Sequence, residues 1–190
     1  MHSFSSRLNA LFAFFLSVMG AVAFGCFAST FYKNYNIGVP IKKHNITLRS
    51  AMDFTTSRQE SDLATIKFSI DGNLSNLFDW NTKQIFMYLV CEYQSANNQL
   101  NQVVLWDRIM LREDADVEKF SVDNLSPKYY FFDDGANLRG LPAKLVLRWN
   151  VIPNSGYMPF AASTDEVQFE FPKQYTAIPA QARPSHYRSL

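Results

Sequence analysis

Residues 85–93 read Ile-Phe-Met-Tyr-Leu-Val-Cys-Glu-Tyr, a nearly continuous apolar and aromatic run. Its length suits a β-strand, and an apolar run without alternation is typical of a central strand that is covered on both faces. The run therefore predicts the centre of a β-sheet, and the sequence around it should supply the neighbouring strands.

Short apolar runs separated by turn signals fill the chain from Ile41 onward. Residues 66–70 alternate between apolar and polar side chains and end at Asp71-Gly72, a typical turn pair. Comparable runs occupy residues 103–111, 129–132, 145–152 and 167–171. About seven strands without a long amphipathic repeat predict an all-β fold, an antiparallel β-sandwich.

One short helical element is expected between two of these strands. Residues 73–81 have the composition of a helical turn, with Leu74, Leu77 and Phe78 facing inward. The chain shows no internal repeat, so the strands are expected to form one domain.

An uncharged segment, residues 8–32, lies between Arg7 and Lys33. As a helix it would span about 37 Å, against about 30 Å of bilayer hydrocarbon. Ala21-Val22-Ala23 and Cys26-Phe27-Ala28 could serve as signal-peptide cleavage contexts, but the apolar run is too long for a cleaved signal. The segment therefore predicts an uncleaved transmembrane signal-anchor. Basic residues on both sides do not orient it cleanly, and on charge alone the C-terminal side would be cytosolic, so the orientation needs other evidence.

Three N-glycosylation sequons bear on this orientation. They begin at Asn45, Asn73 and Asn124, and Asn73 is the best candidate because it follows the Asp71-Gly72 turn. If they are used, the strand-rich region faces the lumen of the secretory pathway. The alternative, that all three are unused, stays open.

The predicted membrane helix carries a stripe of small residues at every fourth position. Small side chains let a second helix approach closely, which is how helices associate in lipid. The stripe is therefore a candidate packing surface, although a helix that is merely rich in small residues would look the same; its members are Ala13, Ser17, Ala21, Gly25 and Ser29.

Composition bounds the remaining chain. There are 18 basic and 17 acidic residues, and Arg7 is the only charged residue before Lys33, so the region after the helix is neutral overall. Neutrality argues against nucleic acid as a partner. No disulfide is predicted between Cys26 and Cys91, because Cys26 lies in the membrane segment and Cys91 lies far from it in an expected strand.

The expected organisation is a cytosolic segment 1–7, a transmembrane helix 8–32, a β-sandwich 33–172 and a flexible tail 173–190.

Residues that carry chemistry are sparse. His44 and His186 stand in no metal-ligand spacing, and no nucleophile elbow or phosphate-binding loop occurs, so no catalytic residue, metal or cofactor is expected. Asp133 and Asp134 precede Gly135 and are better explained as a strand-ending turn than as an acid–base pair.

Three tryptophans leave a second function open. Trp80, Trp106 and Trp149 could form the aromatic platform of a membrane-anchored or secreted sugar-binding sandwich. The spacing of Trp106 and Trp149 within apolar strands favours a core or interface role, whereas Trp80, between Asp79 and Asn81, is expected to be partly exposed.

With these residues in hand, the chain resembles subunit 3 of the eukaryotic signal peptidase complex, a 22/23-kDa accessory subunit family. The resemblance covers most of the chain and rests on ordered blocks. These blocks are residues 11–14 (Leu-Phe-Ala-Phe), 24–27 (Phe-Gly-Cys-Phe), 79–84 with 88–89, 101–107 (Asn-Gln-Val-Val-Leu-Trp-Asp), 131–135 (Phe-Phe-Asp-Asp-Gly) and 149–153.

The resemblance implies a single-pass type II protein of the endoplasmic reticulum membrane with a lumenal β-sandwich. It also implies a hetero-oligomer in the lipid bilayer, in which a separate subunit carries the catalytic serine and this chain is a non-catalytic partner during signal peptide removal. Trp80, Trp106 and Asp107 are the expected interface residues. Two departures are a missing sequon, where Leu141-Pro142-Ala143 stands, and a longer tail after Pro172.

Overall fold

The computed structural model describes residues 3–52, 60–114, 116–133 and 137–176. The chain begins with one helix and continues almost entirely as strands. The elements are α1 (Phe4–Thr30), β1 (Ile41–Met52), β2 (Glu60–Gly72), the 3-10 turn η1 (Ser75–Leu77), β3 (Thr82–Tyr93), β4 (Asn101–Leu111), β5 (Phe120–Leu125), β6 (Phe131–Phe132), β7 (Pro142–Pro153) and β8 (Phe160–Glu170).

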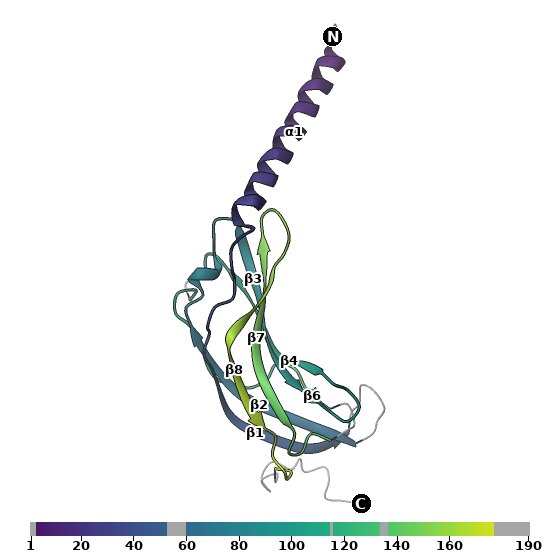
Figure 1. Cartoon of the computed structure of the whole chain (residues 1–190), viewed down its shortest axis with the longest axis vertical. Coiled ribbons are helices and arrows are strands. Elements are labelled where there is room, and N and C mark those ends of the chain that lie inside the picture. The colour runs from purple at the N-terminus through teal and green to yellow at the C-terminus, as the bar shows by residue number, and fades with distance from the viewer. Residues whose placement is uncertain (1–2, 53–59, 115, 134–136, 177–190) are drawn as a thin grey trace, which may run out of the picture.

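The strands form two antiparallel sheets that pack face to face (Figure 1). One sheet has the order β1-β2-β5, with β6 also paired to β2, and the other has the order β4-β3-β7-β8. The predicted antiparallel β-sandwich behind an N-terminal helix is thus confirmed. Because β2 leads through η1 into β3, the chain crosses from one sheet to the other at the end of the sandwich next to α1.

The sheet of β3 confirms that the apolar run at residues 85–93 is a central strand. β3 pairs with β4 on one side and with β7 on the other. Its inward residues Ile85, Met87 and Leu89 are fully buried, whereas Phe86 and Tyr88 on the opposite face are only partly buried. The strand is therefore covered on its edges and on one face, but only in part on the other.

The core between the sheets is made of large apolar side chains. Trp149 and Phe68 are among the largest that are fully buried, and the indole Nε1 of Trp149 donates to the carbonyl oxygen of Tyr35 at 3.1 Å. Cys91 is buried among them as predicted, and burial raises the pKa of its thiol well above the usual range. Leu74 and Leu77 are fully buried and Phe78 is partly buried, so the predicted helical turn and its inward face are confirmed.

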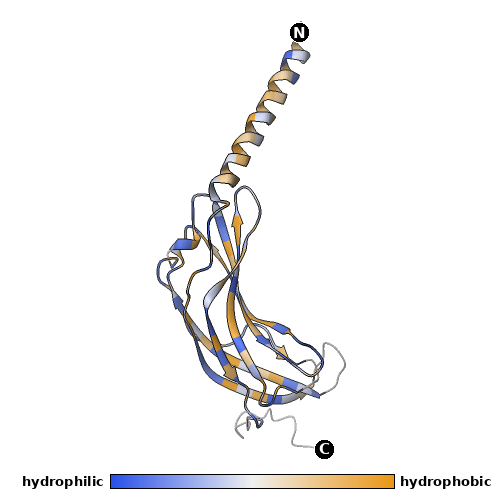
Figure 2. Ribbon diagram, viewed as in Figure 1, coloured by the Kyte–Doolittle hydropathy of each residue, from blue (hydrophilic) through white to orange (hydrophobic). Residues whose placement is uncertain are grey.

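Helix α1 projects from one end of the sandwich and none of its residues is buried (Figure 1). The hydroxyl of Ser3 caps it by accepting from the backbone N–H of Ser6 at 3.2 Å. It is long and apolar enough to cross a membrane, and Figure 2 shows hydrophobic colour over most of its length, in contrast to the alternation along the strands. The helix begins at Phe4, before the uncharged segment, and ends at Thr30, two residues before the predicted end.

Several features differ from the sequence-based prediction. β2 begins at Glu60, six residues before the predicted run at 66–70, and β6 covers only the last two residues of the predicted run at 129–132. β5 was not expected, because its run Phe-Ser-Val-Asp-Asn-Leu has few apolar residues. β8 begins at Phe160, seven residues before the predicted strand at 167–171. At the start of the expected flexible tail, Thr176 donates from its N–H to the Leu48 carbonyl at 2.8 Å and the Tyr175 hydroxyl donates to Asp62 at 2.7 Å, so packing continues past residue 172. The rest of the tail lies outside the described residues.

Candidate interaction surface

The outward side of the sheet β4-β3-β7-β8 is rich in exposed and half-buried apolar side chains. These alternate with the inward core residues along each strand, so no packing within the sandwich requires them. Phe86 and Tyr88 on β3 stack with their ring centroids 5.5 Å apart. We call this set the apolar face; its members are Phe86, Tyr88, Val104, Ile109, Leu111, Ile152 and Phe160.

Charged residues continue this side of the sheet toward the end remote from α1. Glu92 is 6% exposed and is paired with Arg148, and Lys144 lies 3.5 Å from Glu92 and 3.0 Å from Glu166. The hydrogen bond to Glu166 raises the pKa of Lys144 and lowers that of Glu166. The network holds β3, β7 and β8 together without leaving a large unpaired charge on this side.

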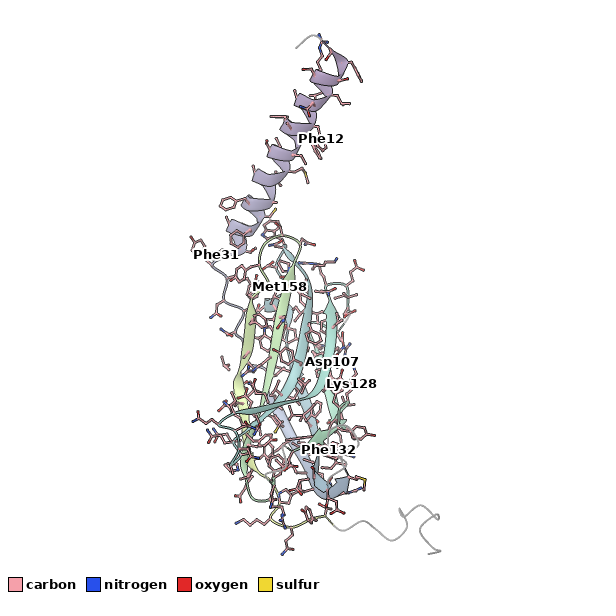
Figure 3. The ribbon with its side chains drawn as sticks, turned by 90° about the vertical axis from the view of Figure 1, so that its right-hand side faces the viewer. Phe12, Phe31, Asp107, Lys128, Phe132 and Met158 are labelled. Carbon is pink, nitrogen blue, oxygen red and sulfur yellow. The ribbon has the colours of Figure 1, made fainter. Side chains whose placement is uncertain are left out.

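Asp107, one of the predicted interface residues, lies on β4 beside the apolar face (Figure 3). Its Oδ1 atom accepts from Lys128 Nζ at 2.7 Å and from the Tyr129 hydroxyl at 2.6 Å. The hydrogen bond from Lys128 is the main reason that the pKa of Asp107 lies below its usual range. Asp107 thus fixes the segment after β5 against the edge of β4.

The three tryptophans differ in burial, in the way that their sequence contexts suggested. Trp106 is 7% exposed and packs in the core, with its ring centroid 6.1 Å from that of Phe68. Trp149 is fully buried, and Trp80 is 60% exposed. Burial favours the core interpretation of Trp106 over a direct contact with a partner. It also leaves Trp80 as the one exposed tryptophan, so the three do not form a sugar-binding platform.

The outward side of the other sheet is polar. We call it the polar face; its members on β1, β2 and β5 include Lys42, His44, Thr47, Thr65, Lys67, Ser69, Ser121 and Asp123. Figure 2 shows the same sheet with hydrophilic colour between the inward apolar positions. A cavity of about 210 Å³ lies here between β1, β2 and β5.

His44, Ser69 and Asp123 meet on the polar face, which sequence reasoning missed because no local motif links them. They are the residue types of a serine-hydrolase triad, in which serine gives its proton to histidine. Here the Ser69 hydroxyl donates directly to Asp123 at 2.7 Å. Its oxygen lies 2.5 Å from Nε2 of His44 and accepts from the N–H of Asn124 at 2.9 Å. Because its proton goes to the Asp123 carboxylate rather than to the histidine, the hydroxyl is a structural node that joins three strands.

All three sequons lie on the polar face or at the ends of its strands. Asn45 is exposed within β1, Asn124 is exposed near the end of β5 with φ 45°, and Asn73 is exposed directly after β2. The Oδ1 atom of Asn73 accepts from the Ser75 N–H at 2.8 Å, the local turn that the sequence suggested. None of the sequons lies on the sheet that carries the apolar face.

The junction between α1 and the sandwich is built around Asp79. It accepts from the Tyr35 hydroxyl at 2.6 Å and from the backbone N–H of Thr82 at 2.9 Å, and Lys33 Nζ lies 3.3 Å away. Burial opposes ionisation of Asp79, but these hydrogen bonds and the lysine charge together lower its pKa. Burial and the bond to Asp79 raise the pKa of Tyr35. The first charged residue after the helix is thereby fixed to the sandwich.

The helix stripe is unoccupied by other parts of the described chain. All five of its residues are exposed, and a Cβ atom added at Gly25 would meet no atom within 4 Å. Ser17 and Ser29 donate their hydroxyls back to the helix carbonyls of Ala13 and Cys26. The stripe therefore presents a smooth surface with its side-chain donors already satisfied.

The described residues contain no group of three or more His, Cys, Asp or Glu that could hold a metal. Asp133 follows β6, and its Oδ1 accepts from the N–H of Asp62 at 3.0 Å, so its carboxylate joins the end of β6 to β2. Asp134 lies outside the described residues. The surface residues that the structure describes therefore offer apolar packing and hydrogen-bonding contacts.

Comparison with known proteins places this architecture in one family. A family model described as "Signal peptidase subunit" matches residues 1–174. Proteins named signal peptidase complex subunit 3 are 47% identical in Homo sapiens and 46% in Gallus gallus, each over 176 residues that cover 92% of this chain and 97% of the relative. The Drosophila melanogaster protein of that name is 42% identical with the same coverage. The chain therefore belongs to the signal peptidase subunit family.

Proposed function

We propose that this chain is a non-catalytic accessory subunit of the signal peptidase complex in the endoplasmic reticulum membrane. Its α1 helix would cross the membrane with the N-terminus in the cytosol, and its β-sandwich would stand in the lumen. There it would support a separate catalytic subunit while that subunit removes signal peptides from secretory precursors. The observation that carries the proposal is the apolar face, a large exposed surface on a chain whose relatives are named as subunits of a complex.

The apolar face has the composition of a protein interface. Aromatic and branched apolar side chains gather on one side of a rigid sheet, and the charged network around Glu92 borders them. The mechanism follows from packing: a rigid sandwich held against a catalytic domain restricts that domain's motion and keeps its catalytic groups in productive geometry.

The distribution of sequons supports the same assignment of faces. Glycans at Asn45, Asn73 or Asn124 would cover the polar face and leave the apolar face open to a partner. Glycan addition would also report the lumenal orientation, since it occurs only on that side of the membrane. Sequential changes to Gln at these positions should therefore remove glycosidase-sensitive gel shifts without loss of partner binding.

A non-catalytic role is supported by the state of Ser69. In a serine nucleophile the hydroxyl gives its proton to a histidine, whereas the Ser69 hydroxyl donates to the Asp123 carboxylate and its oxygen also accepts from the N–H of Asn124. We therefore assign the catalytic chemistry of the complex to another chain.

The helix would contribute a second contact. We propose that the stripe of Ala13, Ser17, Ala21, Gly25 and Ser29 packs against a helix of another subunit. The length of α1 would also influence bilayer thickness near the catalytic site. Replacing Ala21 and Gly25 by Leu should weaken co-purification in mild detergent, and unchanged co-purification would mean that the stripe faces lipid.

The decisive experiment combines purification with depletion. The tagged full-length chain, isolated in mild detergent, should bring down a signal peptidase catalytic subunit in stoichiometric amount. Depleting the chain from cells should cause uncleaved secretory precursors to accumulate, and restoring it should reverse this. Normal precursor cleavage after depletion, with the catalytic subunit still present, would refute the proposed function.

A further inference from the structure

The loop between β7 and β8, residues 154–159, rises from the end of the sandwich and lies beside the base of α1 (Figure 1). The Ser155 hydroxyl donates to the carbonyl oxygen of Ala23 at 3.0 Å. Gly156 has φ +107°, and a Cβ atom there would lie 2.7 Å from Cδ2 of Phe27. Only a glycine allows the loop backbone to come this close to the helix, so the loop follows α1 for part of its length.

The contact with Ala23 places the loop within the depth of the membrane. Counting about 20 residues from Arg7 at roughly 1.5 Å each covers the roughly 30 Å of hydrocarbon, which then ends near Phe27. Ala23 lies four residues earlier, about 6 Å inside that boundary. A tilted helix needs more residues to cross, which would place Ala23 still deeper. The loop tip therefore reaches the depth at which amphipathic segments lie in the interface, about 5–10 Å.

The loop is also free of charge and carries large apolar side chains. Residues 149–164 contain no Asp, Glu, Lys or Arg. Tyr157 is 52% exposed, Met158 55% and Phe160 77%, and Trp80 is exposed at the same end of the sandwich. Figure 3 shows Met158 at the same end of the sandwich as Phe31. The ring of Tyr157 packs edge-on against Phe27 and Phe31, each with centroids 6.0 Å apart.

Backbone polar groups at the start of the loop are hydrogen-bonded within the protein, which favours immersion in an apolar medium. Asn81, itself 2% exposed, accepts from the N–H of Ser155 at 3.1 Å and donates to its carbonyl at 2.9 Å. The N–H of Asn154 donates to the carbonyl of Asn81 at 2.7 Å. The Asn81 amide also donates to Thr30 Oγ1 at 3.1 Å. One buried asparagine thus joins the loop, the sandwich and the helix end.

We infer that the loop of residues 154–159 is immersed in the bilayer interface, with Tyr157 and Met158 among the headgroups and upper acyl chains. The inference rests on the membrane anchoring proposed above. Continuity with the apolar surface of α1 identifies lipid as the occupant, because the loop and the helix form one uncharged surface at one depth. The sandwich is then seated on the membrane at a fixed angle, and aromatic residues at the boundary act as interfacial anchors.

A depth measurement tests this directly. The full-length chain with Cys26→Ala and Met158→Cys is labelled with an environment-sensitive nitrobenzoxadiazole dye and reconstituted in phosphatidylcholine vesicles. Cys91 should stay unlabelled, because it is buried and the pKa of its thiol is raised. The matched control carries Leu100→Cys, a position 58% exposed in the turn between β3 and β4, at the other end of the sandwich.

Immersion predicts blue-shifted emission from the dye at position 158. Lipids with a nitroxide high on the acyl chain should quench it more than lipids with a nitroxide near the chain end, and aqueous iodide should quench it weakly. The dye at position 100 should show the opposite behaviour. Equal iodide quenching at both positions, in vesicles that retain the chain during alkaline carbonate extraction, would overturn the inference while leaving the anchoring intact.

Two other results also decide the matter. Release of the chain by alkaline carbonate would show that α1 does not anchor it, and the inference would fall together with the proposed anchoring. A dye at position 158 that is solvent-like in vesicles of the chain alone, and is shielded only when other subunits are present, would assign the loop to a protein contact and overturn immersion in lipid.

Discussion

The polar face and the apolar face are built on the same strand pattern, yet they differ in how their side chains are satisfied. On the polar face, Ser69 joins His44, Asp123 and Asn124 in one hydrogen-bonded node. On the apolar face, Ile109 is 53% exposed and Leu111 47% exposed. Outward positions of a sandwich are not needed for its core. Their chemistry therefore depends on what lies outside the domain, which we propose to be solvent and glycans on the polar face and a partner protein on the apolar face.

A charge on the apolar face should have the largest effect. Ile109→Lys adds a charge at an exposed position, so the isolated chain should keep its stability. Burying that lysine in an interface should cost about 2 kcal/mol or more, a loss of roughly 30-fold in association with the catalytic subunit. Co-purification measures the loss. Ser121→Lys, which is exposed on the polar face, is the matched control, and equal loss from both variants would remove the distinction between the faces.

Loss of the Ser69 hydroxyl should lower the stability of the chain without affecting signal peptide cleavage. Ser69→Ala leaves the N–H of Asn124 and the carboxylate of Asp123 without their partner, at a cost of about 1–3 kcal/mol. The apparent melting temperature of the purified chain should fall, while secretory-precursor cleavage in cells should continue. Abolished cleavage by a chain that still folds and assembles would instead give Ser69 a catalytic role.

Asp79 lies where the chain passes from the sheet with the polar face to the sheet with the apolar face. Replacing it should have a smaller effect on stability, and the effect should depend on pH. Its pKa in the folded chain lies below the ordinary value of 3.8, so its contribution is present above that value and is lost as pH falls through the lowered pKa. Asp79→Asn should lower stability at pH 7 by about 1 kcal/mol. In thermal unfolding, the difference between the variant and the unmodified chain should shrink in acid; a constant difference would contradict the assigned charge.

The pair of Asp107 and Lys128 should give the smallest effect. Lys128 is solvent-exposed, and ion pairs between exposed groups contribute little because water screens them. Lys128→Met should leave unfolding by heat or denaturant almost unchanged. If this variant instead reduces association with the catalytic subunit, Asp107 belongs to the interface as the sequence predicted, and the apolar face extends to the edge of β4.

The sequence predicted the elements whose signals are local. The apolar run at 85–93 and the alternation at 66–70 fixed two strands of the sandwich, because side-chain period follows backbone geometry. β5 was not predicted, because it is short and its outward residues Ser121 and Asp123 are polar, which leaves few apolar residues in its run. The node of His44, Ser69 and Asp123 could not be predicted, since it depends on the register between strands that are distant in the chain.

By itself, the sequence determined that this chain has one membrane-length helix, a β-sandwich and the ordered blocks of its family. Each depends on residue type and spacing along the chain. Only the tertiary structure decided which outward positions share a face, because sheet order sets which strands are neighbours. It also brought Asn81 and Ser155 to the base of α1, through hydrogen bonds that span 51 residues or more and that no local pattern encodes.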